Sequence, residues 1–137
     1  MYTSSYTFGV ETKFSYAEAR RQVETLLKEV GFGILTEIDV RATLKQKLDV
    51  EFRPYVILGA CNPRIAFEAF KAELEIGTLL PCNVIIYEND KGGTNVSFMD
   101  PLAALGLTDN AGLTAQATKV RLLLEEVVAK LSSKSDR

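Results

Sequence analysis

The alternation of apolar and polar positions along the chain predicts five strands. They are expected at residues 4–14, 33–40, 55–63, 80–88 and 94–99. Strict alternation in the first, second and last of these is typical of strands with one buried face. In the second strand, the face expected to point to the core carries Ile34, Thr36, Ile38 and Val40. The runs at 55–63 and 80–88 are continuously apolar and bounded by glycine or proline, which favours central strands that are buried on both faces.

Helical spacing of apolar residues predicts helices between and after these strands. They are expected at residues 16–30, 41–49, 63–76 and from 108 or 109 to 131, with a short turn at 101–105. Ser15 stands three residues before Glu18, a capping-box pattern, and Gly31 can end the first helix. Asn62 and Pro63 are favoured at the start of a helix, so the third is expected to begin there and to end at Gly77.

The last helix has one continuous apolar face, formed by Leu113, Ala117, Val120, Leu124, Val127 and Leu131. The polar residues 132–137 after it are expected to fray. The segment 89–93, N-D-K-G-G, predicts a hairpin turn between the last two strands.

The order of these elements predicts a single α+β domain over residues 1–137, with a mainly antiparallel sheet and a long C-terminal helix across one face. Such a helix could leave an apolar groove against the sheet, which would suit a small apolar ligand. The alternative is that core side chains fill this space, as they fill most protein interiors.

Composition narrows the classes of partner. The 137 residues are 47% hydrophobic, which is enough for an ordinary core, and the net charge is −2, so we expect no nucleic-acid partner. The first residues lack the basic start and the apolar run of a signal peptide, and no stretch is apolar enough to span a membrane. We therefore expect a cytoplasmic protein without a membrane partner, whose two cysteines are free thiols.

The sequence contains no histidine. Nucleophile activation by histidine, imidazole base catalysis and histidine-ligated zinc are therefore excluded. Because no other nucleophile stands beside a base, we expect a protein that is not an enzyme and that uses no cofactor.

Cys61 and Cys82 are the main candidates for chemistry. Cys61 precedes the predicted helix cap Asn62, so the helix dipole could favour its thiolate. The alternative is that both cysteines are small buried core residues. A parallel arrangement of the flanking strands would separate the two sulfurs, whereas an antiparallel or displaced arrangement would bring them together. Two thiolates are only half of a tetrahedral zinc site, so we expect no metal unless carboxylates such as Glu88 or Asp100, or a second subunit, supply further ligands.

Three further residues complete the candidate site. The hydroxyls of Tyr55 and Tyr87 could line a groove, although core packing with a solvated tip would also explain these two strand residues. Asp100, before Pro101, could cap a turn. The candidate site therefore consists of Cys61, Asn62, Cys82, Tyr55, Tyr87 and Asp100.

Four short motifs carry a resemblance to a known family. They are G-A-C-N-P at 59–63, L-L-P-C-N-V at 79–84, Y-E at 87–88 and D-P at 100–101. Over nearly the whole chain the sequence resembles the bacterial and archaeal domain-of-unknown-function family numbered 302. The resemblance implies a TATA-binding-protein-like fold of the order β-α-β4-α and a homodimer, and it implies no activity. In that scheme the helices predicted at 41–49 and 63–76 are either insertions or errors. The fold name suggests DNA binding, but a fold does not confer a function.

The sequence thus favours a non-enzymatic ligand-binding or interaction module with an apolar groove between the sheet and the C-terminal helix. One alternative is a thiol-dependent redox or metal-linked activity centred on Cys61. Another is a purely structural homodimer.

Overall fold

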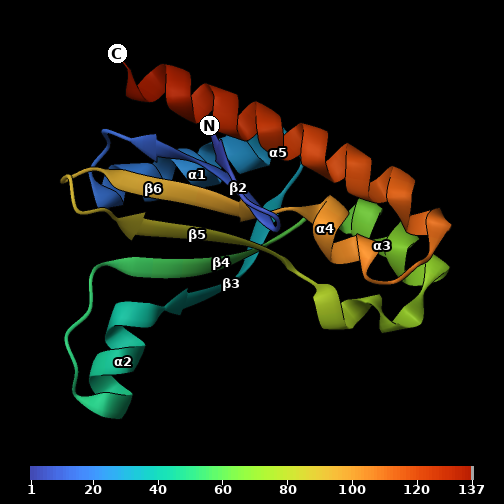
Figure 1. The fold of residues 1–137 in the computed structure, drawn as a ribbon, viewed down its shortest axis with the longest axis horizontal. Helices are drawn as coiled ribbons and strands as arrows, with labels where there is room; N and C mark the ends of the chain where they lie inside the picture. Colours follow the sequence, from blue (N-terminus) through green and yellow to red (C-terminus); the bar gives the residue numbers. More distant parts are fainter. Residues whose placement is uncertain (137) are drawn as a thin grey trace.

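A six-stranded antiparallel sheet forms the centre of the computed structural model, which describes residues 1–136 (Figure 1). The strand order is β1-β2-β6-β5-β4-β3. The strands are β1 (Tyr2–Thr3), β2 (Thr7–Thr12), β3 (Gly33–Asp39), β4 (Tyr55–Cys61), β5 (Cys82–Glu88) and β6 (Thr94–Met99). Every neighbouring pair is antiparallel, so the predicted α+β class and mainly antiparallel sheet are confirmed.

Two helices, α1 (Tyr16–Glu29) and α5 (Thr114–Ser135), pack on one face of the sheet. The order β2-α1-β3-β4-β5-β6-α5 is the one that the family resemblance implied. Within it, α2 (Val40–Leu48) and α3 (Pro63–Ala72) are insertions, and α4 (Pro101–Gly106) is a further one. In Figure 1, α2 projects from the edge of the sheet, whereas α3, α4 and the 3-10 helix η1 (Leu74–Leu79) gather at its other end.

The main core lies between the sheet and the two covering helices. Its fully buried side chains include Phe8, Val23, Leu26, Leu27, Leu58, Val84, Ile86, Phe98, Leu124 and Leu131. The apolar face predicted for the last helix is confirmed, because each of its six residues is buried. Core side chains therefore fill the space between the sheet and most of α5. This is the alternative that the sequence analysis set against an open groove.

Local sequence signals at the first helix are confirmed. Ser15 caps α1, with its hydroxyl accepting a hydrogen bond from the Glu18 backbone N–H at 3.1 Å. At the other end Gly31 has φ of +89°, and the Phe32 N–H donates to the Leu27 carbonyl at 2.9 Å. This is a Schellman motif, in which a residue with positive φ ends the helix.

The core face predicted for β3 is wrong, because the strand contains a β-bulge. Ile34 pairs with Ala60 on the covered face, but beyond the register shift Thr36 pairs with Gly59 and Ile38 with Ile57 on the opposite face. The inserted residue, Leu35, turns the following side chains over. Ile38 is consequently 50% exposed instead of buried.

The expectation that the two central strands are buried on both faces is also wrong. The positions of β4 and β5 are central as predicted, yet Tyr55, Ile57 and Ile85 on the face away from α1 and α5 are only partly buried. In β6, by contrast, residues 94–98 are buried on both faces. On the face away from α1 and α5, Asn95 Nδ2 donates to the hydroxyls of Tyr87 at 3.0 Å and Tyr2 at 3.4 Å.

Several helix ends differ from the prediction. The helix α3 ends at Ala72, because Glu73 is extended with φ of −158°, and a separate 3-10 helix follows up to Leu79. The 3-10 helix η2 (Ala111–Leu113) precedes α5, which therefore begins at Thr114. The tail expected to fray is helical up to Ser135, which is buried and accepts a hydrogen bond from the Lys13 N–H at 2.6 Å. Residue 137 lies outside the described residues.

The hairpin predicted at 89–93 joins β5 to β6 and is confirmed. Gly92 in this turn has φ of +84°, a backbone conformation that glycine adopts without strain. Among residues 1–136, no helix combines the length and the apolar composition that crossing a membrane requires.

Candidate functional site: an apolar cavity at the end of the sheet

The antiparallel pairing of β4 and β5 brings the two cysteines to the same end of the sheet. Cys82 of β5 pairs with Ala60 of β4, which is the neighbour of Cys61. Cys61 itself pairs with Gly33 of β3. The sequence left this point open, because an ordinary crossover through α3 would have made the strands parallel. The helix α3 instead lies beyond the end of the sheet, and β4 and β5 are antiparallel, so the antiparallel alternative is the correct one.

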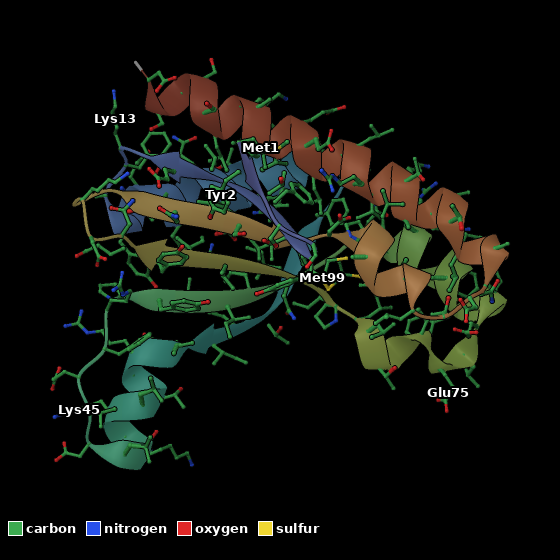
Figure 2. All side chains as sticks on the ribbon, viewed as in Figure 1. Met1, Tyr2, Lys13, Lys45, Glu75 and Met99 are labelled. Atoms are coloured by element: carbon green, nitrogen blue, oxygen red, sulfur yellow. The ribbon has the colours of Figure 1, made fainter. Side chains whose placement is uncertain are left out.

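A cavity of about 300 Å³ lies where the cysteines meet. Its wall comes from the ends of β3, β4, β5 and β6, from α3 and η1, and from α4 and α5. The lining residues are Phe32, Leu35, Thr36, Ala60, Cys61, Asn62, Ile65, Ala66, Ala69, Phe70, Gly77, Leu80, Pro81, Cys82, Met99, Pro101, Leu105, Gln116 and Val120. Figure 2 shows Met99 at the end of the sheet that faces α3 and α4. All of these side chains are uncharged, and most are apolar.

The bulge in β3 helps to shape this cavity. The residue that it inserts, Leu35, and the following Thr36 both line the wall. Gly59 lets the side chains of Thr36 and Pro81 approach β4 closely. A Cβ atom at this position would collide with Thr36 Oγ1 and would lie 2.6 Å from Pro81 Cγ. The sequence gives a strand over this segment but does not reveal the bulge, so these contributions could not be predicted.

Two amide side chains place polar atoms at the cavity wall. Asn62 caps α3 as predicted, with its Oδ1 accepting a hydrogen bond from the Ile65 N–H at 3.3 Å. Gln116, in the first turns of α5, has a buried Oε1 that has no hydrogen-bond partner. Sequence analysis missed Gln116, because a glutamine on a helix is most often solvated. Its place beside the buried Leu113, Ala117 and Val120 is the signal that could have drawn attention to it.

The electrostatics of the cavity favour protonated thiols. Burial raises the pKa of Cys61, which is the opposite of the direction expected from its position before a helix. Burial, together with the proximity of Cys61, raises the pKa of Cys82 to about 11. Both residues are thiols in the structure, and at neutral pH both contribute uncharged, weakly polar surface.

The carboxylates considered for a metal site do not join the cysteines. Among residues 1–136, no three of the Cys, Asp and Glu side chains form a group that could hold a metal ion. Asp100 instead caps α4, accepting from the Leu102 N–H at 2.9 Å, and forms an ion pair with Arg121 at 2.7 Å. It stands between the lining residues Met99 and Pro101, behind the cavity wall.

Tyr55 and Tyr87 lie away from the cavity. They face each other across β4 and β5, with ring centroids 5.4 Å apart and an angle of 10° between the ring planes. Their place is the sheet face opposite α1 and α5, near the hairpin end of β5. The structure therefore brings together Cys61, Asn62 and Cys82 but not the two tyrosines.

Three of the four motifs that carried the family resemblance reach the cavity, whereas the fourth, Tyr87–Glu88, lies away from it. Ala60, Cys61 and Asn62 come from the first motif, Pro81 and Cys82 from the second, and Pro101 from the last. Other lining residues, such as Phe70 and Leu105, belong to helices whose packing no short motif reveals.

Comparisons with known proteins agree with this architecture. The family model described as domain of unknown function DUF302 matches residues 8–131. A crystal structure of an uncharacterized conserved DUF302 protein from Bacillus stearothermophilus is similar to the chain, with 26% sequence identity and a TM-score of 0.86. The similarity covers 93% of this chain and 99% of that one. No curated protein matches the sequence.

Proposed function

The chain belongs to the DUF302 family, a domain of unknown function, and we propose that it is a non-enzymatic module that binds a small apolar molecule in the cavity at the end of the sheet. The single observation that carries this proposal is a cavity of about 300 Å³ lined by uncharged, mostly apolar side chains. The ligand lies against the first turns of α5, where the core packing between this helix and the sheet gives way to the cavity.

The size and the apolar lining of the cavity together argue for a ligand. Small-molecule sites are concave and are lined mostly by hydrophobic side chains, with a few polar groups, as this cavity is. An engineered apolar cavity of about 150 Å³ is enough to bind benzene. A cavity of about 300 Å³ therefore has room for a bicyclic or similarly compact molecule, and this volume stands at the lower end of the range of ligand pockets.

The thiols take part in this proposal as lining, not as nucleophiles. The thiolate is the reactive form of cysteine, and burial raises the pKa of both Cys61 and Cys82. The geometry therefore favours the binding module over the thiol-dependent alternative. The cytoplasmic location expected from the sequence stays a prediction.

The experiment is a titration of the protein with naphthalene, followed by NMR of its methyl groups. We expect saturable shifts confined to residues that line the cavity, and loss of binding in Ala66→Leu, whose larger side chain enters the cavity. The matched control is Ala42→Leu on α2, where the same substitution is exposed and remote from the cavity. Binding that persists in Ala66→Leu, or shifts spread over other surfaces, would reject the proposal.

We propose in addition that a second copy of the chain covers the sheet face opposite α1 and α5. A row of isoleucines crosses this face, because Ile38 pairs with Ile57 and Ile57 with Ile85. Ile38 is 50% exposed, and the Tyr55–Tyr87 stack continues the row. In a two-fold symmetric interface each patch meets itself, so an uncharged centre avoids repulsion between like charges.

Size-exclusion chromatography with light scattering tests this second proposal. We expect a dimer, and a shift to the 15.1 kDa monomer in Ile38→Lys, which would place two like charges at the interface. The matched control is Leu122→Lys, which changes a similarly exposed side chain on α5. A monomeric parent protein, or a dimer unaffected by Ile38→Lys, would contradict the proposal.

A further inference from the structure

We propose that residues 63–80 form a lid over the cavity, which opens as one unit and which the bound molecule holds closed. The lid consists of α3 and η1, which lie together beyond the end of the sheet (Figure 1). This inference rests on the proposed function and names the segment that controls access to its binding site.

The buried apolar side chains form two separate clusters, and the cavity lies between them. The main core lies between the sheet and the helices α1 and α5. The second cluster joins the lid to α4 and to the start of α5, and its buried residues are Ala69, Ile76, Leu105, Leu113 and Ala117. The cavity wall includes Ala60 of the main core and Leu105 of the second cluster. The lid therefore packs on a cluster that the cavity separates from the main core.

Few buried contacts hold the lid in place. Of residues 63–80, only Ala69 and Ile76 are buried. Within residues 1–136, the hydrogen bond that ties the lid to a residue beyond its own N-cap runs from Asn110 Nδ2 to the Ala72 carbonyl at 3.3 Å. Segments with few buried apolar contacts open at a low cost in free energy, so the lid is expected to open more readily than the sheet.

The two ends of the lid leave the sheet at the same place. The lid follows β4 after Asn62 and leads into β5, which begins at Cys82. Ala60 and Cys82 pair across these two strands, so the ends of the lid emerge from neighbouring positions. A segment whose ends lie close together can swing about them while the strands keep their pairing.

The bound molecule stabilises the closed lid through α3. Four residues of this helix line the cavity, namely Ile65, Ala66, Ala69 and Phe70. Phe70 is also 39% exposed, so its ring stands at the mouth of the cavity. A ligand gives these side chains apolar contacts that are lost when the lid opens. A molecule that binds only the closed form lowers the population of the open form by a factor of one plus the ratio of its free concentration to its Kd.

Hydrogen exchange followed by mass spectrometry tests the lid. In the protein without ligand, we expect the amides of residues 63–80 to exchange about a hundredfold faster than those of β4 and β5. With naphthalene at about three times its Kd, exchange in the lid should slow about fourfold. The matched control within the same measurement is α2, in which no residue from 40 to 48 is buried, and its exchange should stay unchanged.

Two variants separate opening of the lid from unfolding of the whole molecule. Ile76→Val trims the buried side chain that anchors the lid, and it should raise exchange in residues 63–80 about fivefold. Val23→Ala weakens the main core at a residue that does not line the cavity. It should raise exchange in β4 and β5 and leave exchange in the lid unchanged.

Each contrary result has a distinct meaning. Exchange in the lid at the same rate as in β4 and β5, or an equal rise in lid and strands in Val23→Ala, would overturn the lid, because the segment then opens only with the whole molecule. Binding of naphthalene in the cavity without slower exchange in residues 63–80 would also overturn the lid, and it would leave the proposed function intact. Failure of naphthalene to bind in the NMR titration would reject the proposed function itself, and the lid with it.

Discussion

Arg121 on α5 and Asp100 before α4 form an ion pair in which Arg121 Nη1 lies 2.7 Å from Asp100 Oδ2. The side chains are only 19% and 15% exposed. The guanidinium of Arg121 also stacks over the Phe8 ring, 4.1 Å from its centroid. This pair therefore joins α4, α5 and β2 directly behind the part of the cavity wall that contains Met99 and Pro101.

We expect Asp100→Ala to lower the free energy of unfolding by about 3 kcal/mol. The substitution leaves Arg121 partly buried beside only Glu125, and it removes the cap on the Leu102 N–H. Urea unfolding followed by circular dichroism measures the change. The variant Asp100→Asn separates the two causes, because an amide oxygen keeps the cap and loses the charge. A loss below about 1 kcal/mol in Asp100→Ala would show that the pair contributes little.

Local signals predicted the parts of the fold that depend on a few neighbouring residues. The caps at Ser15 and Asn62 and the stop at Gly31 were found because each satisfies backbone groups within its own turn. The apolar face of α5 was found because its spacing is regular over many turns. The identity of Cys61, Asn62 and Cys82 as members of one site came from their motifs, and the structure shows them sharing one wall.

The features of the fold and of the cavity that were not predicted depend on contacts between segments distant in the sequence. A single sequence does not show such contacts. A β-bulge adds one residue without an apolar signature, so the reversal of Thr36 and Ile38 could not be foreseen. Helical spacing also does not reveal how far α3 is covered, because Phe67 on this helix is 62% and Phe70 39% exposed. Likewise, the burial of Gln116 Oε1 without a hydrogen-bond partner follows from the packing around α5 and leaves no trace in the sequence pattern. Such features are properties of packing, and pattern alone does not fix them.

We expect stability to fall in alkaline solution because of Cys82. Its pKa is raised from the ordinary value of 9.0 to about 11 in the folded protein. Between these values the unfolded chain releases the thiol proton while the folded chain keeps it, so stability decreases as the pH rises. The full difference corresponds to about 2–3 kcal/mol, lost between pH 9 and pH 11.

Urea unfolding at pH 8 and at pH 11 measures this effect in the parent protein and in Cys82→Ala. The variant lacks the thiol, so its stability should decline less over this range, whereas the other titrating groups act equally in both proteins. Cys61→Ala is the control, because Cys82 keeps its environment apart from one neighbour. Equal declines in the parent and in Cys82→Ala would contradict the prediction.

We expect Gly9→Ala to destabilise the sheet and Gly33→Ala to be tolerated. A Cβ atom on Gly9 would collide with the Val96 carbonyl oxygen and lie 2.9 Å from both Ser97 Cα and the Tyr2 ring. Because backbone atoms on a paired strand cannot move aside, the loss should be about 2–3 kcal/mol. A Cβ on Gly33 would meet no atom within 4 Å, so alanine there should change stability by less than about 1 kcal/mol. Thermal unfolding of the two variants checks the contrast, and similar losses in both would refute it.

We expect Asn62→Ala and Ser15→Ala to have the same effect on stability and different effects on binding. Each substitution removes one helix cap, from the Ile65 N–H in the first case and from the Glu18 N–H in the second, at a cost of about 1 kcal/mol. Only Asn62 belongs to the cavity wall, and loss of its cap loosens the start of α3 next to Cys61. The affinity for naphthalene, measured by titration under conditions where both variants are folded, should therefore fall severalfold in Asn62→Ala and stay unchanged in Ser15→Ala. Equal affinities in the two variants would show that the start of α3 does not shape the binding site, and a fall in both would mean that affinity follows global stability instead of the local geometry of the wall.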